Sequence, residues 1–429
     1  MAHDVFSRQP IRLRSDYVEK DSKKILLFVF LTIFLDLVGF GMFIPIIPLL
    51  AKELAASDSL AVNLSTLFSI GTLLAVTFLG RASDKWGRKP LLLATIAISA
   101  LAQGLTGFAT QLPLLFALRF VAGMAAGNIS VAQAAISDIT PPEKRSGNMV
   151  FIGLAFGLGF AIGPALGAVL ASLWPDSSIW PISVAAAALN LFNLAGIWLF
   201  LPETYVKKEK GDTQSPHPFS GSEGHSSVLS RTWLKDLKFV ASQNQLWILF
   251  LVGFLQVAAF VGFESILSLL LSASFGFDKS KIYHVFIFIG VSLLVVNGGI
   301  TRPFIKKFGD FNTLKVGQIL LVLSFFTLGL TLPSEVYLYV SLIVLTLGLG
   351  LANPSLNGSI SNRISNEHQG LVLGLNQSMG ALARILGPAF QSIWFAQLGS
   401  QGALFISGGV MLLGSALGLW FLKPPPQNS

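Results

Sequence analysis

The stretch Gly80–Pro90 reads Gly-Arg-Ala-Ser-Asp-Lys-Trp-Gly-Arg-Lys-Pro and lies between two long apolar segments. Its only acid, Asp84, is surrounded by four basic residues, namely Arg81, Lys85, Arg88 and Lys89. Gly80 and Gly87 supply the backbone freedom that tight turns require. Pro90 suits the first turn of a following helix, where its missing N–H costs no hydrogen bond. The stretch therefore predicts a short charged loop between two helices.

The composition predicts a chain that crosses a membrane many times. Only 12% of the 429 residues are charged, and 53% are hydrophobic. Soluble domains carry about 25% charged residues, so this chain could not cover a surface that faces water. The absence of cysteine excludes disulfides and thiolate metal sites, and the five His residues show no metal-ligand spacing. The net charge of +8 falls in loops rather than on one face, which disfavours a nucleic-acid partner.

Twelve apolar segments are long enough to cross about 30 Å of hydrocarbon as helices. They are 25–50, 61–79, 91–110, 112–137, 147–173, 179–201, 246–272, 283–303, 313–332, 336–360, 370–398 and 401–422. The sequence thus predicts an all-α integral membrane protein with two six-helix halves. Its predicted parts are a tail 1–24, a first half 25–202, a linker 203–243, a second half 244–422 and a tail 423–429.

Loop charges predict the orientation of the chain. Basic residues concentrate in loops that follow even-numbered segments, such as 80–90, 144–145 and 302–307. Loops after odd-numbered segments carry fewer, with 278–281 as an exception. The positive-inside rule then places both termini in the cytoplasm. In the N-terminal tail no small-residue cleavage site follows a short apolar core, so we predict no cleaved signal peptide.

The two halves carry traces of one repeat. Glu143 precedes Gly163–Pro164 by twenty residues, and Glu367 precedes Gly387–Pro388 by the same twenty. A weaker copy of the Gly80–Pro90 stretch occurs at Lys306–Asp310. A parallel duplication of this kind places a substrate site between the halves, near the middle of the bilayer.

The repeat offset of 224 also places Asp138 on Asn362. This correspondence predicts that the two residues occupy equivalent places in the two halves.

Several motifs together resemble the major facilitator superfamily. Gly80–Pro90 resembles the loop between helices 2 and 3 of that family. The other matching stretches are Asp36–Gly41 followed by Pro45 and Pro48, Arg119 with Gly123, the set Gly153, Gly157, Gly159, Gly163, Pro164 and Gly167, Ala135–Thr140, and Leu201–Thr204. The combination resembles the twelve-helix drug:proton antiporters, most closely their tetracycline-efflux branch.

The resemblance implies proton-coupled efflux of a small amphipathic compound by alternating access. The proton gradient would be the energy source, no cofactor is expected, and no nucleotide-binding Gly-x-x-x-x-Gly-Lys sequence occurs. We expect a monomer in the lipid bilayer that is not an enzyme. Two alternatives stay open. One is a proton-coupled transporter of a metabolite, nutrient or siderophore-like compound, and the other is a membrane sensor with a transporter fold.

Three ionisable residues within the predicted spans are candidates for proton coupling. An acid at membrane depth costs roughly 2.5–3.5 kcal/mol on insertion scales. Asp36 is therefore either a structural carboxylate, satisfied by a neighbouring helix or by Arg119, or a protonation switch. Glu264 either faces the external mouth, contacts a cationic substrate or shares the coupling. The resemblance implies that Arg119 tunes proton binding, and an interfacial anchor is the alternative.

The remaining candidates fall into three groups. The first is a conformational latch of Gly80, Arg81, Asp84, Gly87 and Arg88, expected to hold the far half in the outward-facing state. The second is the antiporter motif of Gly153, Gly157, Gly163, Pro164 and Gly167, where Pro164 would bend its helix. The third is a substrate surface of Phe40, Phe43, Gln133, Gln256, Phe260, Phe263 and Arg384.

Two details of the substrate surface are predicted. The face of Asp36 continues through Thr32, Phe40 and Phe43 and would line a cavity. Arg384 would be buried near Gln377 and Gln391, where it could bind an anionic group.

Overall fold

The computed structural model describes residues 15–140, 145–174, 179–205, 245–364 and 369–421, and within these ranges it is helical with no strand. The first half contains α1 (Ser15–Phe43), α2 (Ile47–Glu53), α3 (Asp58–Trp86), α4 (Arg88–Thr106), α5 (Leu112–Ala125), α6 (Asn128–Ile139), α7 (Arg145–Leu173) and α8 (Trp180–Phe200). The second contains α10 (Leu246–Phe275), α11 (Lys279–Val295), the π-helical turn η2 (Val296–Ile300), α12 (Thr301–Leu330), α13 (Glu335–Ser361) and α14 (Gln369–Phe421).

The predicted all-α membrane fold is confirmed. The described residues contain ten helical segments long and apolar enough to span a membrane. Two of them, Lys279–Leu330 and Leu375–Gly418, are 52 and 44 residues long. Each contains one glycine with non-helical backbone angles, Gly309 or Gly399. Since about 20 residues suffice for one crossing, dividing these two segments at their glycines gives the twelve crossings that the sequence predicts.

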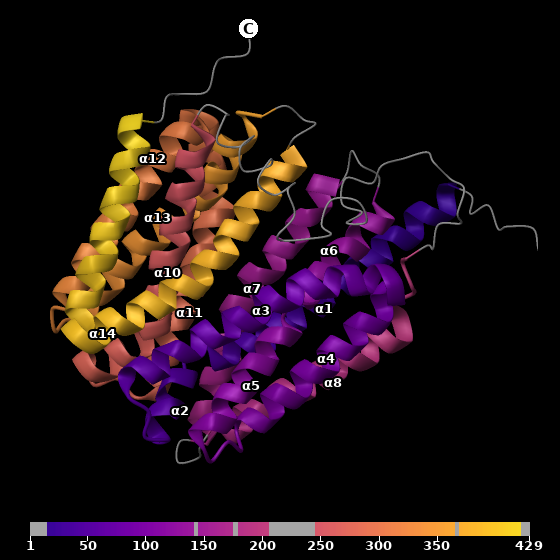
Figure 1. Ribbon diagram of the computed structural model, residues 1–429, viewed down its shortest axis with the longest axis horizontal. Helices are drawn as coiled ribbons and strands as arrows, with labels where there is room; N and C mark the ends of the chain where they lie inside the picture. The colour runs from indigo at the N-terminus through magenta and orange to yellow at the C-terminus, as the bar shows by residue number, and fades with distance from the viewer. Residues whose placement is uncertain (1–14, 141–144, 175–178, 206–244, 365–368, 422–429) are drawn as a thin grey trace, which may run out of the picture.

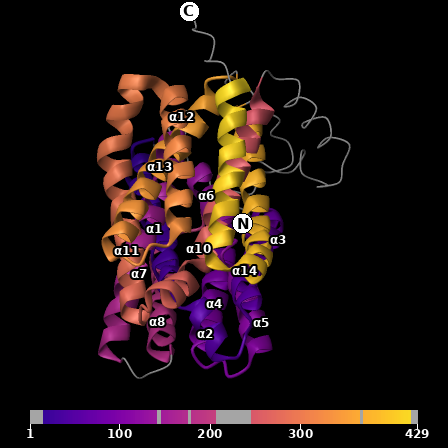
Figure 2. The ribbon, with the colours of Figure 1, turned by 90° about the vertical axis from the view of Figure 1, so that its left-hand side faces the viewer.

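The helices form two bundles that lie side by side (Figures 1 and 2). We call α1–α8 the N half and α10–α14 the C half. The end where α8 finishes and α10 begins is the linker end, and the opposite end, which carries Glu53 and Lys279, is the closed end. In Figure 1 the two bundles diverge toward the linker end and meet at the closed end.

Buried apolar clusters of the described residues show where the two halves join. One cluster joins N-half residues such as Met42 and Ile46 to C-half residues such as Ile282 and Tyr283. A second cluster, which includes Val29, contains residues of the N half alone. Apolar burial therefore ties the two halves together near the closed end.

The Gly80–Pro90 stretch differs from its prediction as a loop. Helix α3 continues to Trp86, so Gly80 lies inside a helix, and a Cβ there would meet nothing within 4 Å. The turn is made by Gly87 alone, at φ 97° and ψ 160°. The charged residues before it form the last turns of α3, because a helix can continue past an apolar span with polar side chains. Pro90 lies in the first turn of α4, as predicted.

The internal repeat is visible in the backbone. Gly309 has φ 76° and ψ 162°, nearly the angles of Gly87. The residue after each glycine bonds to a side chain near the end of a later helix of the same half, α6 in the N half and α13 in the C half. Arg88 pairs with Asp138 at 2.9 Å, and Asp310 accepts a hydrogen bond from Asn362 Nδ2 at 3.0 Å. The predicted equivalence of Asp138 and Asn362 is thus confirmed, with the charge of the pair changed between the halves.

Candidate functional site

Asp36 lies in α1 with only 6% of its surface exposed. Its Oδ1 accepts a hydrogen bond from Ser99 Oγ of α4 at 2.8 Å. Its Oδ2 accepts one from Asn128 Nδ2 of α6, also at 2.8 Å. Both donors are neutral, and among the described residues Asp36 has no ion-pair partner. A carboxyl group held by neutral donors can gain or lose a proton without breaking a salt bridge.

One face of α4 continues the polar contacts of Asp36. Gln103 Nε2 donates to Ser99 Oγ at 3.0 Å, and Asn190 Nδ2 of α8 donates to Gln103 Oε1 at 3.2 Å. Ser99, Gln103 and Thr106 recur at helical spacing, which puts them on one side of α4. We call this row of three residues the α4 ladder.

The opposite end of the α4 ladder reaches Arg119 of α5. Arg119 Nη2 donates to Thr106 Oγ1 at 3.1 Å, and its guanidinium lies 5.1 Å from the centre of the Phe43 ring. Arg119 is 3% exposed, and its Nε has no hydrogen-bond partner among the described residues. Of the two partners considered for Asp36, the structure shows the neighbouring helices, through Ser99 and Asn128, and no direct pair with Arg119. Neutral side chains of α4 stand between the two charges.

The sequence predicts that the face of Asp36 lines a cavity through Thr32, Phe40 and Phe43. The structure differs, because two of these three residues are buried. Thr32 is 3% exposed, and its hydroxyl donates to the Phe28 carbonyl one turn earlier in α1. Phe43 is fully buried under Arg119. Phe40 is half-buried and stacks on Phe68 with ring centres 4.7 Å apart.

The charges of the Gly80–Pro90 stretch meet at Arg88. Its Nη1 lies 2.7 Å from Asp84 Oδ1, and its Nε lies 2.9 Å from Asp138 Oδ2 of α6. Ser83 Oγ also accepts from Arg88. Arg81 is exposed. These three side-chain partners of Arg88 belong to the N half, and among the described residues Asp84 forms no ion pair with the C half in this form, which is closed at the other end. Its predicted role in the outward-facing state stays a prediction.

Glu203, which follows α8, caps the start of α4 just after Gly87. Its carboxylate accepts the backbone N–H of Arg88 at 2.9 Å and that of Lys89 at 3.2 Å. These N–H groups belong to the first turn of α4 and have no intrahelical partner, so an acid is favoured there. The sequence analysis noted the Leu201–Thr204 motif but did not foresee this capping contact.

The glycines of α7 allow close packing on both of its sides. A Cβ on Gly163 would lie 2.7 Å from Val38 O and 2.8 Å from Gly41 Cα of α1. A Cβ on Gly157 would meet Leu294 of α11, and one on Gly167 would meet the Tyr283 ring. Helix α7 runs unbroken through Pro164 and also contains Gly153. It therefore sits between α1 and α11, as a seal between the halves requires.

A hydrogen bond crosses between the halves beside this seal. Tyr283 of α11 is fully buried, and its hydroxyl donates to the Met42 carbonyl at 2.8 Å. Pro45 has no N–H and ends α1, and the next amide, that of Ile46, bonds to Phe43 O at 3.1 Å. This break leaves the Met42 carbonyl available to the other half.

An ion pair also crosses between the halves, nearer the surface of the closed end. It joins Lys279 Nζ of α11 to Glu53 Oε1 of α2 at 2.9 Å. Both side chains are partly exposed, so the pair contributes at most about 1 kcal/mol. The buried Tyr283 contact and the apolar packing around it carry more of the closure.

Replacing Tyr283 with Phe should loosen the closed end, because it removes one hydrogen bond between the halves and keeps the ring. A bond of this kind contributes about 0.5–1.5 kcal/mol, so the open fraction at this end should rise roughly two- to tenfold. Ala161 reports the change, since it lies against Gly290 across the halves. The chain has no native cysteine, so maleimide labelling of an Ala161→Cys variant has no background. An unchanged labelling rate in the Tyr283→Phe background would contradict a role of the Tyr283–Met42 bond in closure.

Several predicted substrate residues of the C half are engaged within that half. Gln256 is 1% exposed. Its Nε2 donates to Asn353 Oδ1 at 2.6 Å, and its Oε1 accepts from Gln318 Nε2 at 2.5 Å. Phe263 is 1% exposed and packs edge-on against Phe325. Phe260 is half-buried. The polar network around Gln256 is therefore a contact among helices α10, α12 and α13.

Other mid-helix residues are more accessible. Gln133 of α6 and Arg384 of α14 are exposed, and Glu264 of α10 is half-buried. The expected burial of Arg384 is thus wrong, although it lies well inside its helix. Exposed Asn353 and Gln377 share this property. Because polar side chains in a membrane helix avoid lipid, they mark surfaces that face water or a ligand.

Sequence reasoning missed four residues that the structure places at the centre. Ser99, Asn128 and Gln103 hold or support Asp36, and Tyr283 joins the halves. The available signal was polarity inside an apolar span. It applies equally to residues that only knit helices together, such as Asn193, whose side chain donates to the Thr32 carbonyl at 2.9 Å.

Comparison with known proteins agrees with this architecture. The sequence profile of the Major Facilitator Superfamily matches residues 29–388. The chain belongs to the Major Facilitator Superfamily. Its fold is accordingly that of a family of membrane transporters.

Within that superfamily the chain is similar to drug-resistance proteins. It is 26% identical to the class H tetracycline resistance protein of Pasteurella multocida, over 92% of this chain and 94% of that one. It is 28% identical to the bovine (Bos taurus) Major facilitator superfamily domain-containing protein 10, over 98% and 97% of the two chains. The crystal structure of the human organic anion transporter MFSD10 (TETRAN) matches with a TM-score of 0.68 and 26% identity, covering 92% of this chain and 99% of that one.

Proposed function

We propose that this chain is a proton-coupled efflux transporter that exports a small amphipathic compound by alternating access. The observation that carries the proposal is Asp36, an acid enclosed in the N half whose partners among the described residues are neutral donors. The similarity to tetracycline and multidrug resistance proteins supports the direction of transport.

Energetics support a switchable carboxyl at Asp36. Placing an acid at membrane depth costs roughly 2.5–3.5 kcal/mol. Hydrogen bonds to a charged group contribute about 1.5–3 kcal/mol each, and Asp36 has two. Cost and compensation are of similar size, so a modest change in the surroundings, such as water entering from one side, is enough to change the protonation state.

The α4 ladder gives the switch a structural consequence. Ionised Asp36 accepts from both Ser99 and Asn128. A protonated carboxyl is itself a donor and has to surrender one of these bonds or turn it around. The packing of α1 against α4 and α6 therefore differs between the two protonation states. Since α1 also packs on α7, which contacts the C half, protonation at Asp36 can bias the closure of the halves.

The energy available from the gradient is adequate. One charge that moves through 100 mV provides about 2.3 kcal/mol. Since 1.4 kcal/mol corresponds to about a tenfold ratio, this supports a substrate gradient of roughly fifty-fold per charge.

The proposed orientation places the linker end in the cytoplasm of a bacterial cell, with both termini there. The cluster of Arg81, Lys85, Arg88 and Lys89 at this end is the charge pattern that the positive-inside rule expects. The structure, closed at the opposite end, then corresponds to an inward-facing form of a monomeric transporter.

Inverted membrane vesicles test the function and its direction together. They should accumulate exported compounds from a panel of tetracyclines, lipophilic cations and organic anions when respiration acidifies their interior. An uncoupler should abolish the accumulation. Extrusion from the vesicles would instead favour uptake of a nutrient or metabolite. Binding with no gradient-dependent movement would favour a sensor.

Arg384 favours an organic anion as a second candidate substrate class. It is exposed in the middle of α14 and makes no hydrogen bond or ion pair among the described residues, although the Glu264 carboxylate of α10 is near enough to offset part of its charge. The human relative of known structure is named as an organic anion transporter. A guanidinium is well suited to bind a carboxylate with two parallel hydrogen bonds.

If the substrate is an anion, Arg384→Gln should raise its KM about tenfold or more, because hydrogen bonds to a charged group contribute about 1.5–3 kcal/mol. Arg384→Lys should retain part of the affinity, since it keeps the charge and loses the two-pronged geometry. The KM of cationic compounds should not rise in either variant. An equal loss for anions and cations would refute a specific anion contact.

A further inference from the structure

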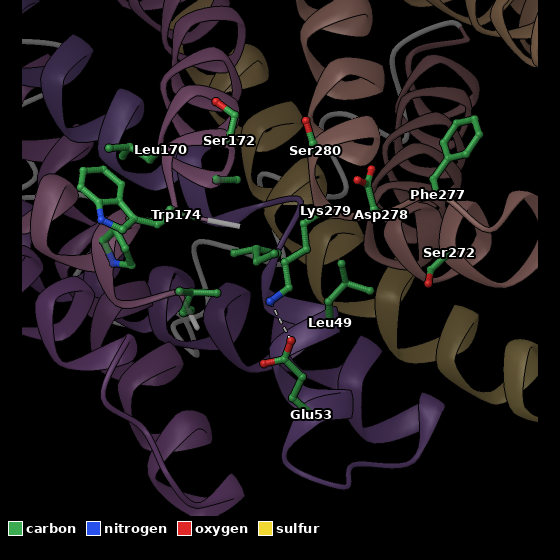
Figure 3. Close-up of a pocket in the computed structure, with 15 residues that line it drawn as sticks. Leu49, Glu53, Leu170, Ser172, Trp174, Ser272, Phe277, Asp278, Lys279 and Ser280 are labelled. Atoms are coloured by element: carbon green, nitrogen blue, oxygen red, sulfur yellow. Dashed lines mark ion pairs between the residues drawn. The ribbon is translucent and has the colours of Figure 1, made fainter. Parts of the chain in front are cut away.

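A cavity of about 490 Å³ lies at the closed end, with walls from both halves (Figure 3). The N half contributes Leu49 and Glu53 of α2 and Trp174 just after α7. The C half contributes Asp278 and Lys279 at the start of α11. This volume lies within the range of sites for drug-sized molecules, about 300–1,000 Å³. The cavity is separate from Asp36 and the α4 ladder.

The cavity joins an apolar body to an acidic side. Its apolar walls include Ile46, Ile179 and Phe277, which are at most 5% exposed and so form a fixed surface. Trp174 lines one side with 44% of its surface exposed, and its ring centre lies 6.3 Å from that of Trp180. Tryptophan is the ring that attracts cations best.

The charges of the lining favour a cation. The lining holds two carboxylates, Glu53 and Asp278, and one ammonium, Lys279. Lys279 is paired with Glu53 at 2.9 Å (Figure 3). Asp278 Oδ1 accepts the Lys281 backbone N–H at 2.9 Å as the N-cap of α11, and among the described lining residues its carboxylate has no ion-pair partner. An organic cation with apolar substituents would meet both the Trp174 ring and the Asp278 carboxylate.

The cavity depends on contact between the halves. Opening the closed end would separate Glu53 from Lys279 and Met42 from Tyr283, and it would move the α11 wall away from Trp174. A ligand that touches both walls then binds the closed form better than the open form. Such a ligand shifts the population toward closure by its difference in affinity.

We propose that this cavity binds an amphipathic organic cation and that occupancy holds the closed end shut. The site is distinct from Asp36 and lies between the halves at the end through which an exported compound has to leave, so a compound bound there slows transport. The chain has no native cysteine, so single cysteines can be labelled without background. Because the cavity lies away from Asp36, binding can be measured without a proton gradient.

The first test measures binding of tetraphenylphosphonium to the purified protein in nanodiscs, with empty nanodiscs as the blank. Trp174→Ala should weaken binding about tenfold, through lost ring contact. Asp278→Asn keeps the helix cap, since Asn caps as well as Asp, and should weaken binding of the cation. The same variant should leave binding of the neutral probe triphenylphosphine oxide unchanged. Binding that is insensitive to both substitutions would overturn the proposed site.

The second test measures closure. Tetraphenylphosphonium should slow maleimide labelling of the Ala161→Cys variant, in proportion to its occupancy. Adding Trp174→Ala should remove this protection at the same probe concentration. Labelling that stays fast at saturating probe would refute the link to closure.

A cross-link provides the matched control. In a Glu53→Cys/Lys279→Cys variant, one acid and one base are lost together, and Asp278 remains. Joining the two thiols with a bis-maleimide spacer should keep tetraphenylphosphonium binding within about twofold of the unlinked variant, because the closed form already carries the site. Loss of binding on cross-linking would overturn the proposal. Repeating the binding assay with Asp36→Asn should give the same affinity, which separates this site from the proposed proton coupling.

Discussion

Asp36→Asn is expected to abolish net, gradient-driven transport while substrate exchange across the membrane persists. Asparagine keeps the size of the side chain and can still accept from Ser99 or Asn128, but it carries no exchangeable proton. The variant should therefore fold and bind substrate, and its two halves should still alternate. Net efflux should fall to the background of empty vesicles, and counterflow of labelled substrate should stay within about threefold of the unmodified protein.

A matched acid-to-amide change controls for charge removal. Asp58 is a surface acid near the closed end, paired with Lys52 at 2.7 Å and 49% exposed at its side chain. An exposed pair contributes about 0–1 kcal/mol, so Asp58→Asn should transport normally. Loss of counterflow together with net efflux in Asp36→Asn would show that the carboxyl has a structural role instead.

Gly163→Ala is expected to disrupt the α1–α7 contact and lower both stability and transport. The added methyl group would lie 2.7 Å from Val38 O and 2.8 Å from Gly41 Cα, both of which are backbone atoms. Backbone cannot move aside as a flexible side chain can, so α1 and α7 have to separate. Overpacking of this kind costs typically 1–3 kcal/mol. Thermal unfolding in detergent and transport rate should both fall.

Gly196→Ala is the control for this substitution. A Cβ at Gly196 meets nothing within 4 Å, so the change only replaces Gly by Ala in α8. Alanine is the better helix former by about 1 kcal/mol, and stability should be unchanged or higher. If both variants unfold at the temperature of the unmodified protein, the close contact of α1 and α7 is not needed for the fold.

Much of the fold could be predicted because it depends on local composition. Apolar length indicates the spans, and α4 and α5 begin near the starts of the predicted segments 91–110 and 112–137, although α4 ends earlier, at Thr106. The repeat was recognisable because Gly87 and Gly309 need positive φ in both halves. Gly80 was misjudged because a glycine inside a helix and a glycine in a turn look alike in sequence.

The candidate site was predicted less completely because it depends on how helices are rotated. Asp36 was identifiable as an acid within an apolar run. That its partners are Ser99 and Asn128, rather than Arg119, depends on which faces of α4 and α6 turn toward α1. The Tyr283–Met42 bond joins residues 241 positions apart. No local pattern encodes a contact that forms only when the two halves close.

Proton movement in proteoliposomes tests the central claim most directly. A pH-sensitive dye is trapped inside, a pH gradient is imposed, and a substrate found in the vesicle panel is added. Substrate should collapse the gradient with the unmodified protein and with Asp58→Asn, but not with Asp36→Asn. Equal proton movement in the Asp36→Asn variant, or none in the unmodified protein while the substrate still crosses the membrane, would contradict proton coupling at Asp36.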